Sequence, residues 1–205
     1  MGGELRIGRI LVSTGANGPG TRLVIWFQGC PFCCKGCFNP EFHDTEGGSL
    51  MSRSELFNRI VCQPDIEGVT FTGGEPLLQA SSLIPLAQAI KGAGLTIVCY
   101  TGYTLEQIKV GIPPSARHLV PYLDILIDGL FEEKEKAPLL WRGSRNQRVH
   151  FLTNRYEHLA EQANQEGRRE AEVLVGPDSI AMTGIFDIEF WERLKAKLSG
   201  HNNER

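Results

Sequence analysis

Hydrophobic residues along the middle of this chain follow two alternating patterns, which predict strands and helices in turn. Runs rich in β-branched residues, typical of strands, occur at 68–74, 95–102 and 123–129. Between them, residues 81–94 have the apolar spacing of a helix that ends in glycines, and residues 104–110 fit a short helix. The pattern therefore predicts the order β-α-β-α-β.

Two further strands and a helix are predicted before this unit. The runs at 6–12 and 22–27 read as strands, and the segment between them is rich in the turn residues Asn, Gly and Pro. A helix is predicted over 52–62, because Ser52 stands three residues before Glu55, as in a capping box, and apolar residues follow at helical spacing.

The three strands of the central unit end alike, in the pairs Thr72-Gly73, Thr101-Gly102 and Asp128-Gly129. Their spacing of about 30 residues is that of β-α-β units, in which the strands run parallel. Ligands of such sheets bind at the carboxyl ends of the strands. A closed eight-stranded barrel needs about 250 residues, so we expect an α/β fold with an open partial barrel or an open sheet.

Composition limits the class of protein. The chain has 205 residues, 41% of them hydrophobic, and no linker-like segment, so we expect one domain. A formal charge of -3 without a polybasic run gives no reason to expect a nucleic-acid or membrane partner. We find no pattern of a signal peptide or membrane span, and therefore expect a cytoplasmic protein with reduced thiols.

Four cysteines, Cys30, Cys33, Cys34 and Cys37, fall within eight positions. Such a group can hold zinc, although zinc sites usually pair two separate Cys-x-x-Cys motifs, and a redox Cys-x-x-Cys would leave two thiols unused. Three thiolates at the spacing of Cys30, Cys34 and Cys37 can instead ligate three irons of a 4Fe-4S cluster. Residues 30, 33 and 37 fit the same role with a different spacing.

A second motif, Gly73-Gly74-Glu75-Pro76, ends a predicted parallel strand just before a helical segment. Alone it fits an ordinary strand-to-helix turn. Some forty residues after a Cys-x3-Cys-x2-Cys loop it is more specific, since glycines let the backbone approach a ligand closely. Their carbonyls and Glu75 can accept hydrogen bonds from an ammonium group.

With these two motifs the sequence resembles the radical S-adenosylmethionine enzymes. The resemblance implies that Cys30, Cys34 and Cys37 ligate one 4Fe-4S cluster per chain, that Cys33 is not a ligand, and that S-adenosylmethionine binds the open iron. It also implies a partial (β/α) barrel of the radical S-adenosylmethionine type with mostly parallel strands. The residues that it assigns to cofactor binding are Gly36, Cys37, Phe38, Gly73, Gly74 and Glu75.

Six blocks in order narrow the resemblance to the glycyl-radical activases that serve anaerobic ribonucleotide reductases. They are NGPGTR (17–22), GCFN (36–39), GGEPLL (73–78), YTGYTLEQI (100–108), ILIDGLF (125–131) and LLWRGSRNQRVH (139–150). The resemblance implies an oxidoreductase that abstracts hydrogen from a glycine of the reductase large subunit. It also implies a small electron donor such as flavodoxin or ferredoxin.

Other side chains have two interpretations, a structural one and a contact with cofactor or partner. This group comprises Arg22, Tyr100, Thr101, Asp128, Arg142, Asn146 and Gln147. Arg22 can pair with the cofactor's carboxylate or belong to a turn, and Asp128 can cap a turn. Phe38 can equally pack within its loop. Cys62 and Cys99 lie in apolar patterns and are expected in the core.

The carboxyl-terminal part departs from the family pattern. We expect a single radical S-adenosylmethionine domain over 1–205, with a core at 6–152 and an extension at 155–205 that forms a strand, a turn, a strand and a helix. Arg145 stands where the family often has serine.

Three functional hypotheses are consistent with the sequence. The first is a glycyl-radical activase for an anaerobic ribonucleotide reductase. The second is a radical S-adenosylmethionine enzyme that modifies another peptide or a small molecule. The third is a non-catalytic zinc or iron-sulfur binding module.

Overall fold

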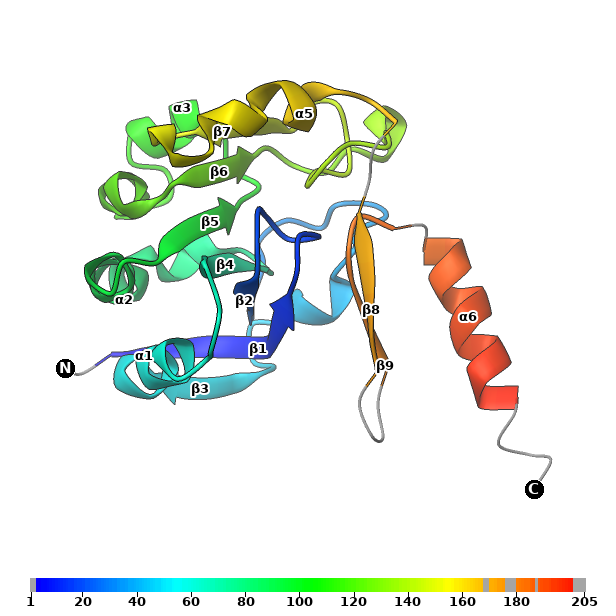
Figure 1. The fold of residues 1–205 in the computed structure, drawn as a ribbon, viewed down its shortest axis with the longest axis horizontal. Helices are drawn as coiled ribbons and strands as arrows, with labels where there is room; N and C mark the ends of the chain where they lie inside the picture. Colours follow the sequence, from blue (N-terminus) through cyan, green and yellow to red (C-terminus); the bar gives the residue numbers. More distant parts are fainter. Residues whose placement is uncertain (1–2, 168–169, 176–179, 187, 201–205) are drawn as a thin grey trace.

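The computed structural model describes residues 3–167, 170–175, 180–186 and 188–200, and Figure 1 shows their arrangement. The strands are β1 (Glu4–Ser13), β2 (Arg22–Phe27), β3 (Ser49–Ser52), β4 (Gly68–Gly73), β5 (Thr96–Tyr100), β6 (Ile125–Asp128), β7 (Arg148–Phe151), β8 (Ala171–Val175) and β9 (Ile180–Gly184). The α-helices are α1 (Arg53–Val61), α2 (Ala80–Gly92), α3 (Leu105–Lys109), α4 (Ala116–Leu119), α5 (Ala160–Asn164) and α6 (Ile188–Gly200).

One sheet in the described chain has the strand order β3-β1-β2-β4-β5-β6-β7. Its four central strands, β2, β4, β5 and β6, run parallel, whereas β1, β3 and β7 pair antiparallel with their neighbours. The sheet stays open between its edge strands β3 and β7. The predicted β-α-β-α-β order is confirmed, and the fold is a mixed α/β structure with a mostly parallel centre.

Side chains alternate between the two faces of the sheet, as the pleat requires. On β2, Ile25 and Phe27 belong to the main core, which α1 and α2 cover, while Val24 and Trp26 face the opposite side. Because both faces are covered, β2 is buried along its whole length. This explains why its sequence reads as a continuous apolar run.

The carboxyl ends of the parallel strands gather at one edge of the sheet. Phe27, the last residue of β2, pairs with Gly73 at the end of β4, and Tyr100 of β5 pairs with Ile127 of β6. In Figure 1 the arrowheads of β5 and β6 point toward the β8–β9 hairpin. The cysteine loop begins at this edge, directly after Phe27.

The carboxyl-terminal segment forms an antiparallel hairpin of β8 and β9, followed by α6. The predicted strands and helix are confirmed, while the predicted turn at 176–179 lies outside the described residues. Cys99 is buried as expected. The expectation for Cys62 is wrong, because this residue follows the last turn of α1 and is exposed. No helix of the described chain has the length and apolar character needed to cross a membrane.

Candidate functional site

A cavity of about 990 Å³, including its open mouth, lies at the carboxyl ends of the parallel strands. It is lined by the turn before β2, the end of β2, the cysteine loop, the turns after β4 and β5, the loop between β6 and β7, and residues 183–186. Ligands of open α/β sheets bind at this edge. The cavity is therefore the candidate site.

Three of the four clustered cysteines line the cavity, namely Cys30, Cys34 and Cys37. Cys33 is exposed and does not line it. The backbone N–H of Cys30 donates to the carbonyl of His43 at 3.1 Å, and that of Cys37 donates to the carbonyl of Cys34 at 3.2 Å. These bonds fold the loop so that three thiols face one space and the fourth faces solvent.

The donor set fits a 4Fe-4S cluster. Burial raises the pKa of Cys30 to about 11 and also raises the pKa of Cys34 and of Cys37, so the free thiols are protonated at neutral pH and would release protons on binding iron. In the described chain, no three His, Cys, Asp or Glu side chains are grouped around one metal position. A cluster does not require such convergence, because each thiolate binds a different iron.

The two glycines after β4 allow close packing of backbone against backbone. Gly73 has a φ of +103°, and a Cβ on it would lie 2.6 Å from the backbone nitrogen of Phe27. A Cβ on Gly74 would lie 2.3 Å from the carbonyl oxygen of Gly29 and 2.7 Å from that of Phe42. Gly74 therefore packs under the loop that carries Cys30, a role that the sequence motif did not reveal.

Glu75 lines the cavity, but neighbouring donors already surround its carboxylate. Oε1 accepts hydrogen bonds from the N–H of Leu77 and the hydroxyl of Thr101, both at 2.9 Å, and Oε2 accepts from the N–H of Gly102 at 2.8 Å. Burial outweighs these neutral donors and raises the pKa of Glu75 to about 7. Glu75 thus ties the turn after β4 to the turn after β5.

Tyr100 and Thr101 both line the cavity at the end of β5. Burial raises the pKa of Tyr100 well above its usual value, so its hydroxyl remains protonated. The hydroxyl of Thr101 donates to Glu75 and accepts from the N–H of Tyr103 at 3.1 Å. The structure therefore brings these two predicted residues into the site.

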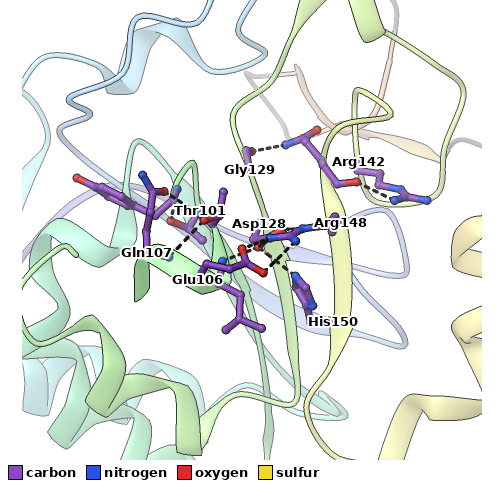
Figure 2. A network of polar contacts seen from close by, with 12 residues as sticks. Thr101, Glu106, Gln107, Asp128, Gly129, Arg142, Arg148 and His150 are labelled. Carbon is purple, nitrogen blue, oxygen red and sulfur yellow. Dashed lines mark hydrogen bonds and ion pairs between the residues drawn. The ribbon is translucent and has the colours of Figure 1, made fainter. Parts of the chain in front are cut away.

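Asp128 lies at the end of β6 but does not line the cavity. Figure 2 shows its carboxylate among Arg148, His150 and the start of α3. Arg148 Nη2 lies 2.6 Å from Oδ2, His150 Nε2 lies 3.0 Å from it, and the N–H of Leu105 donates to it at 2.6 Å. These partners hold the pKa of Asp128 at about 2 despite burial, so it fastens α3 to β7.

Arg22 is fully buried and lies away from the cavity. Its guanidinium donates to the hydroxyl of Thr70 at 2.9 Å and to the carbonyls of Pro19, Val69 and Thr96 at 2.9 to 3.1 Å. Burial lowers its pKa. Through these hydrogen bonds, Arg22 joins the turn before β2 to strands β4 and β5.

The predicted residues near β7 order a loop at the cavity wall. Gln147 accepts from the N–H of Gly143 at 2.9 Å and donates to the carbonyl of Gly129 at 3.1 Å. Asn146 is exposed, donates to the carbonyl of Leu130 and lies outside the cavity lining. Arg142 lines the cavity, and its guanidinium donates to the carbonyls of Gln147 and Ala163 at 2.8 and 3.2 Å, while its buried Nε has no hydrogen-bond partner among the described residues.

The cavity also contains residues that sequence reasoning missed. Asn17 and His43 line it, as do Phe131, Trp141 and the segment 183–186. The segment 183–186 had only a strand pattern, which carries no information about what the strand packs against. Phe38 combines both of its interpretations, because it lines the cavity and packs edge-on against Phe131 with ring centroids 5.3 Å apart.

The chain matches the model of a known family. The family described as a 4Fe-4S single cluster domain matches residues 16–150, which include the cysteine loop and the turns after β4, β5 and β6. The match does not extend to the β8–β9 hairpin or α6.

Curated relatives share a common name, anaerobic ribonucleoside-triphosphate reductase-activating protein. The relative from Haemophilus influenzae is 34% identical over 143 residues, covering 65% of this chain and 90% of the relative. The Vibrio cholerae relative is 34% identical over 149 residues, with 67% and 92% covered. The relative from Enterobacteria phage T4 is 34% identical over 141 residues, with 65% and 85% covered.

Proposed function

Because this chain belongs to the 4Fe-4S single cluster domain family and to the family of anaerobic ribonucleoside-triphosphate reductase-activating proteins, we propose that it activates an anaerobic ribonucleotide reductase. It is a radical S-adenosylmethionine oxidoreductase that forms a glycyl radical on the large subunit of that reductase. The single observation that carries the proposal is the common cavity of Cys30, Cys34 and Cys37, from which Cys33 is excluded.

In this proposal the chain's own residues hold and orient two bound groups. Cys30, Cys34 and Cys37 hold one 4Fe-4S cluster, and S-adenosylmethionine binds between the cysteine loop and the turn after β4. When bound, the reduced cluster and S-adenosylmethionine supply a 5'-deoxyadenosyl radical, with methionine as the other product. The backbone at Gly73 and Gly74, which lines the cavity, offers polar groups to the cofactor.

The partners and organisation follow from the same family. We assign a small electron donor such as flavodoxin or ferredoxin, no nucleic-acid or membrane partner, and a cytoplasmic location. We propose that the open, mostly parallel sheet is a partial barrel of the radical S-adenosylmethionine type. The chain is one such domain over 1–205, with a core at 6–152 and an extension at 155–205.

The ligand assignment is tested by replacing each cysteine with alanine and reconstituting the cluster anaerobically. Cys30→Ala, Cys34→Ala and Cys37→Ala each lose the intact cluster, because no other thiol faces the cavity, whereas the matched control Cys33→Ala keeps it. Iron and sulfide analysis with electron paramagnetic resonance reads the outcome. If the single substitution Cys33→Ala abolishes the cluster, the ligand assignment is wrong.

The substrate is tested by mixing reduced protein, S-adenosylmethionine and the cognate reductase. We expect a glycyl-radical doublet in the electron paramagnetic resonance spectrum, with a matching amount of 5'-deoxyadenosine. A chain that binds the cluster but never forms 5'-deoxyadenosine is a non-catalytic binding module.

A second candidate function is modification of another peptide or a small molecule. One observation favours it: residues 183–186, outside the family match, supply part of the cavity wall. Turnover stimulated by a metabolite or another peptide, with a reductase that stays radical-free, would select this alternative.

A further inference from the structure

The extension beyond the family match forms part of the candidate site. Residues Thr183, Gly184, Ile185 and Phe186 line the same cavity as the three cysteines. Figure 1 shows the β8–β9 hairpin standing across the edge to which β5 and β6 point. A wall in this position limits how a bound molecule is oriented. The contacts that attach the hairpin to the core therefore help to determine the shape of the site.

Buried polar contacts attach the hairpin to the core. Asn17 Nδ2 donates to the hydroxyl of Thr183 at 2.8 Å and to that of Ser13 at 3.0 Å, and Thr183 is only 3% exposed. Near the other strand, the N–H of Thr14 donates to Glu172 Oε1 at 2.7 Å. Because buried hydrogen bonds are costly to break, the contact of Asn17 with Thr183 fixes β9 against the turn between β1 and β2. The exposed contact of Thr14 with Glu172 joins β8 to the same turn.

The end of β9 passes very close to the core. Gly184 has a φ of +95°, and a Cβ there would lie 2.4 Å from the carbonyl oxygen of Glu170 and 2.8 Å from Ala16 Cβ. The N–H of Ile185 donates to the same carbonyl at 2.8 Å. The chain therefore turns at Gly184, and this turn places Phe186 in the cavity wall.

Phe186 completes a group of three aromatic rings. Its ring packs edge-on against Phe38 with centroids 5.7 Å apart, and Phe38 packs against Phe131 in the same manner. All three residues line the cavity, and Phe38 directly follows Cys37. A Cβ on Gly143 would lie 2.7 Å from the ring of Phe38 and 2.9 Å from that of Phe131, so both rings pack directly on the backbone there.

We propose that Phe186 binds the nucleoside part of S-adenosylmethionine and that the extension thereby contributes a residue to the cofactor site. The inference rests on the proposed function. Its chemical basis is that three rings from separate segments form an apolar, polarisable wall beside a thiol of the cluster loop, and such a wall suits a planar base. The polar groups of the cavity, including the backbone at Gly73 and Gly74, remain for the methionine part.

The test compares substitutions at two phenylalanines of the extension. Phe186→Ala removes the ring, Phe186→Leu keeps an apolar side chain without a ring, and Phe186→Tyr keeps the ring. Phe190→Ala is the matched control, because Phe190 is 47% exposed and does not line the cavity. Equilibrium dialysis of the reconstituted holoprotein measures dissociation constants for S-adenosylmethionine, 5'-methylthioadenosine and methionine separately.

We expect Phe186→Ala and Phe186→Leu to weaken binding of S-adenosylmethionine and 5'-methylthioadenosine by about three- to tenfold. Methionine binding and iron content should stay at the level of the unsubstituted protein. Phe186→Tyr and Phe190→Ala should bind all three probes normally. A melting temperature for each variant shows whether the hairpin remains folded.

Three outcomes would overturn the inference. The first is unchanged binding of S-adenosylmethionine in Phe186→Ala, and the second is normal binding in Phe186→Leu. The third is a loss of iron that parallels the loss of binding in Phe186→Ala, which would mean that Phe186 protects the cluster. If the unsubstituted holoprotein binds and cleaves S-adenosylmethionine in these cases, the proposed function stands and only the role of Phe186 fails. If that protein neither binds nor cleaves it, the proposed function fails first.

Discussion

Glu75 and Asp128 are both buried carboxylates at the carboxyl ends of parallel strands, yet their environments have opposite effects. Neutral N–H and hydroxyl groups surround Glu75, and burial raises its pKa to about 7. Asp128 has Arg148 and His150 beside it, and its pKa falls to about 2. A charged donor such as Arg148 favours the ionised form of a buried acid more strongly than neutral donors do.

The two carboxylates also differ in their relation to the cavity. Glu75 lines the cavity and fixes the turns that form its floor, whereas Asp128 faces away from it and holds α3 against β7. A polar residue at the end of a parallel strand therefore does not by itself belong to the ligand site. The side of the strand on which its partners lie decides its role.

The largest expected effect is the loss of the Asp128 carboxylate. Asp128→Ala leaves the N–H of Leu105 and part of the Arg148 guanidinium without a partner, at a cost of about 3 kcal/mol in the free energy of unfolding. Urea titration measures it. In the matched control Glu166→Ala, an exposed ion pair with Arg145 is lost and the expected cost is far smaller. Equal costs would show that burial does not set the strength of the Asp128 contacts.

Local patterns in the sequence were sufficient to predict the central strands and helices. Periodicity, the Ser52 cap and glycine endings are all short-range signals, and the structure confirms the elements that they predicted. The partners of the carboxylates were not predictable in this way. Thr101 lies 26 residues from Glu75, and Arg148 lies 20 residues from Asp128, so only the folded sheet brings them together.

The candidate site also combines features that depend on local sequence with features that depend on long-range contacts. The grouping of Cys30, Cys34 and Cys37 could be read from one loop, and their role as ligands remains a prediction. Phe186 could not be found, because its position depends on the contact of Asn17 with Thr183, which are 166 residues apart. Arg22 was assigned two roles, and its burial became evident only once the strands were placed around it.

The next largest effect is a pH dependence that originates at Glu75. Its pKa rises from 4.5 to about 7 on folding, so the folded chain binds this proton more tightly than the unfolded chain. The stabilisation is complete below pH 4.5 and is lost as the pH rises through about 7. Between pH 5 and 7 we expect a loss of about 2 kcal/mol, measured by urea titration at each pH.

Glu75→Gln removes this titration and should flatten the profile between pH 5 and 7. Glu166→Gln is the matched comparison and should leave that range unchanged, because the hydrogen bond and charge of Arg145 lower the pKa of Glu166 below its usual value. The carboxylate of Asp128 also titrates below this range. The pKa of Asp128 falls from 3.8 to about 2 on folding, so its contribution is present above about pH 4 and is lost as the pH falls toward 2. A profile for Glu75→Gln parallel to that of the unsubstituted chain would assign the pH dependence to another group.

A smaller effect is expected from Thr101→Val, which keeps the shape of the side chain and removes its hydroxyl. Glu75 Oε1 then loses one of its donors, and the N–H of Tyr103 loses its acceptor. We expect a cost of about 1–2 kcal/mol and a further rise in the pKa of Glu75. Urea titration at several pH values measures both, and an unchanged pH midpoint would exclude Thr101 from the control of Glu75.

The smallest effect is expected at Glu106, the second carboxylate beside Arg148. Both of its oxygens contact the guanidinium, at 3.1 and 2.6 Å, and Figure 2 shows it next to Asp128. Glu106 is exposed, however, and water and salt screen its charge, so Glu106→Gln should change the free energy of unfolding far less than Asp128→Ala does. The small effect should shrink further in 1 M salt. A loss as large as that of Asp128→Ala would mean that the number of contacts with Arg148, and not burial, determines how firmly α3 is held to β7.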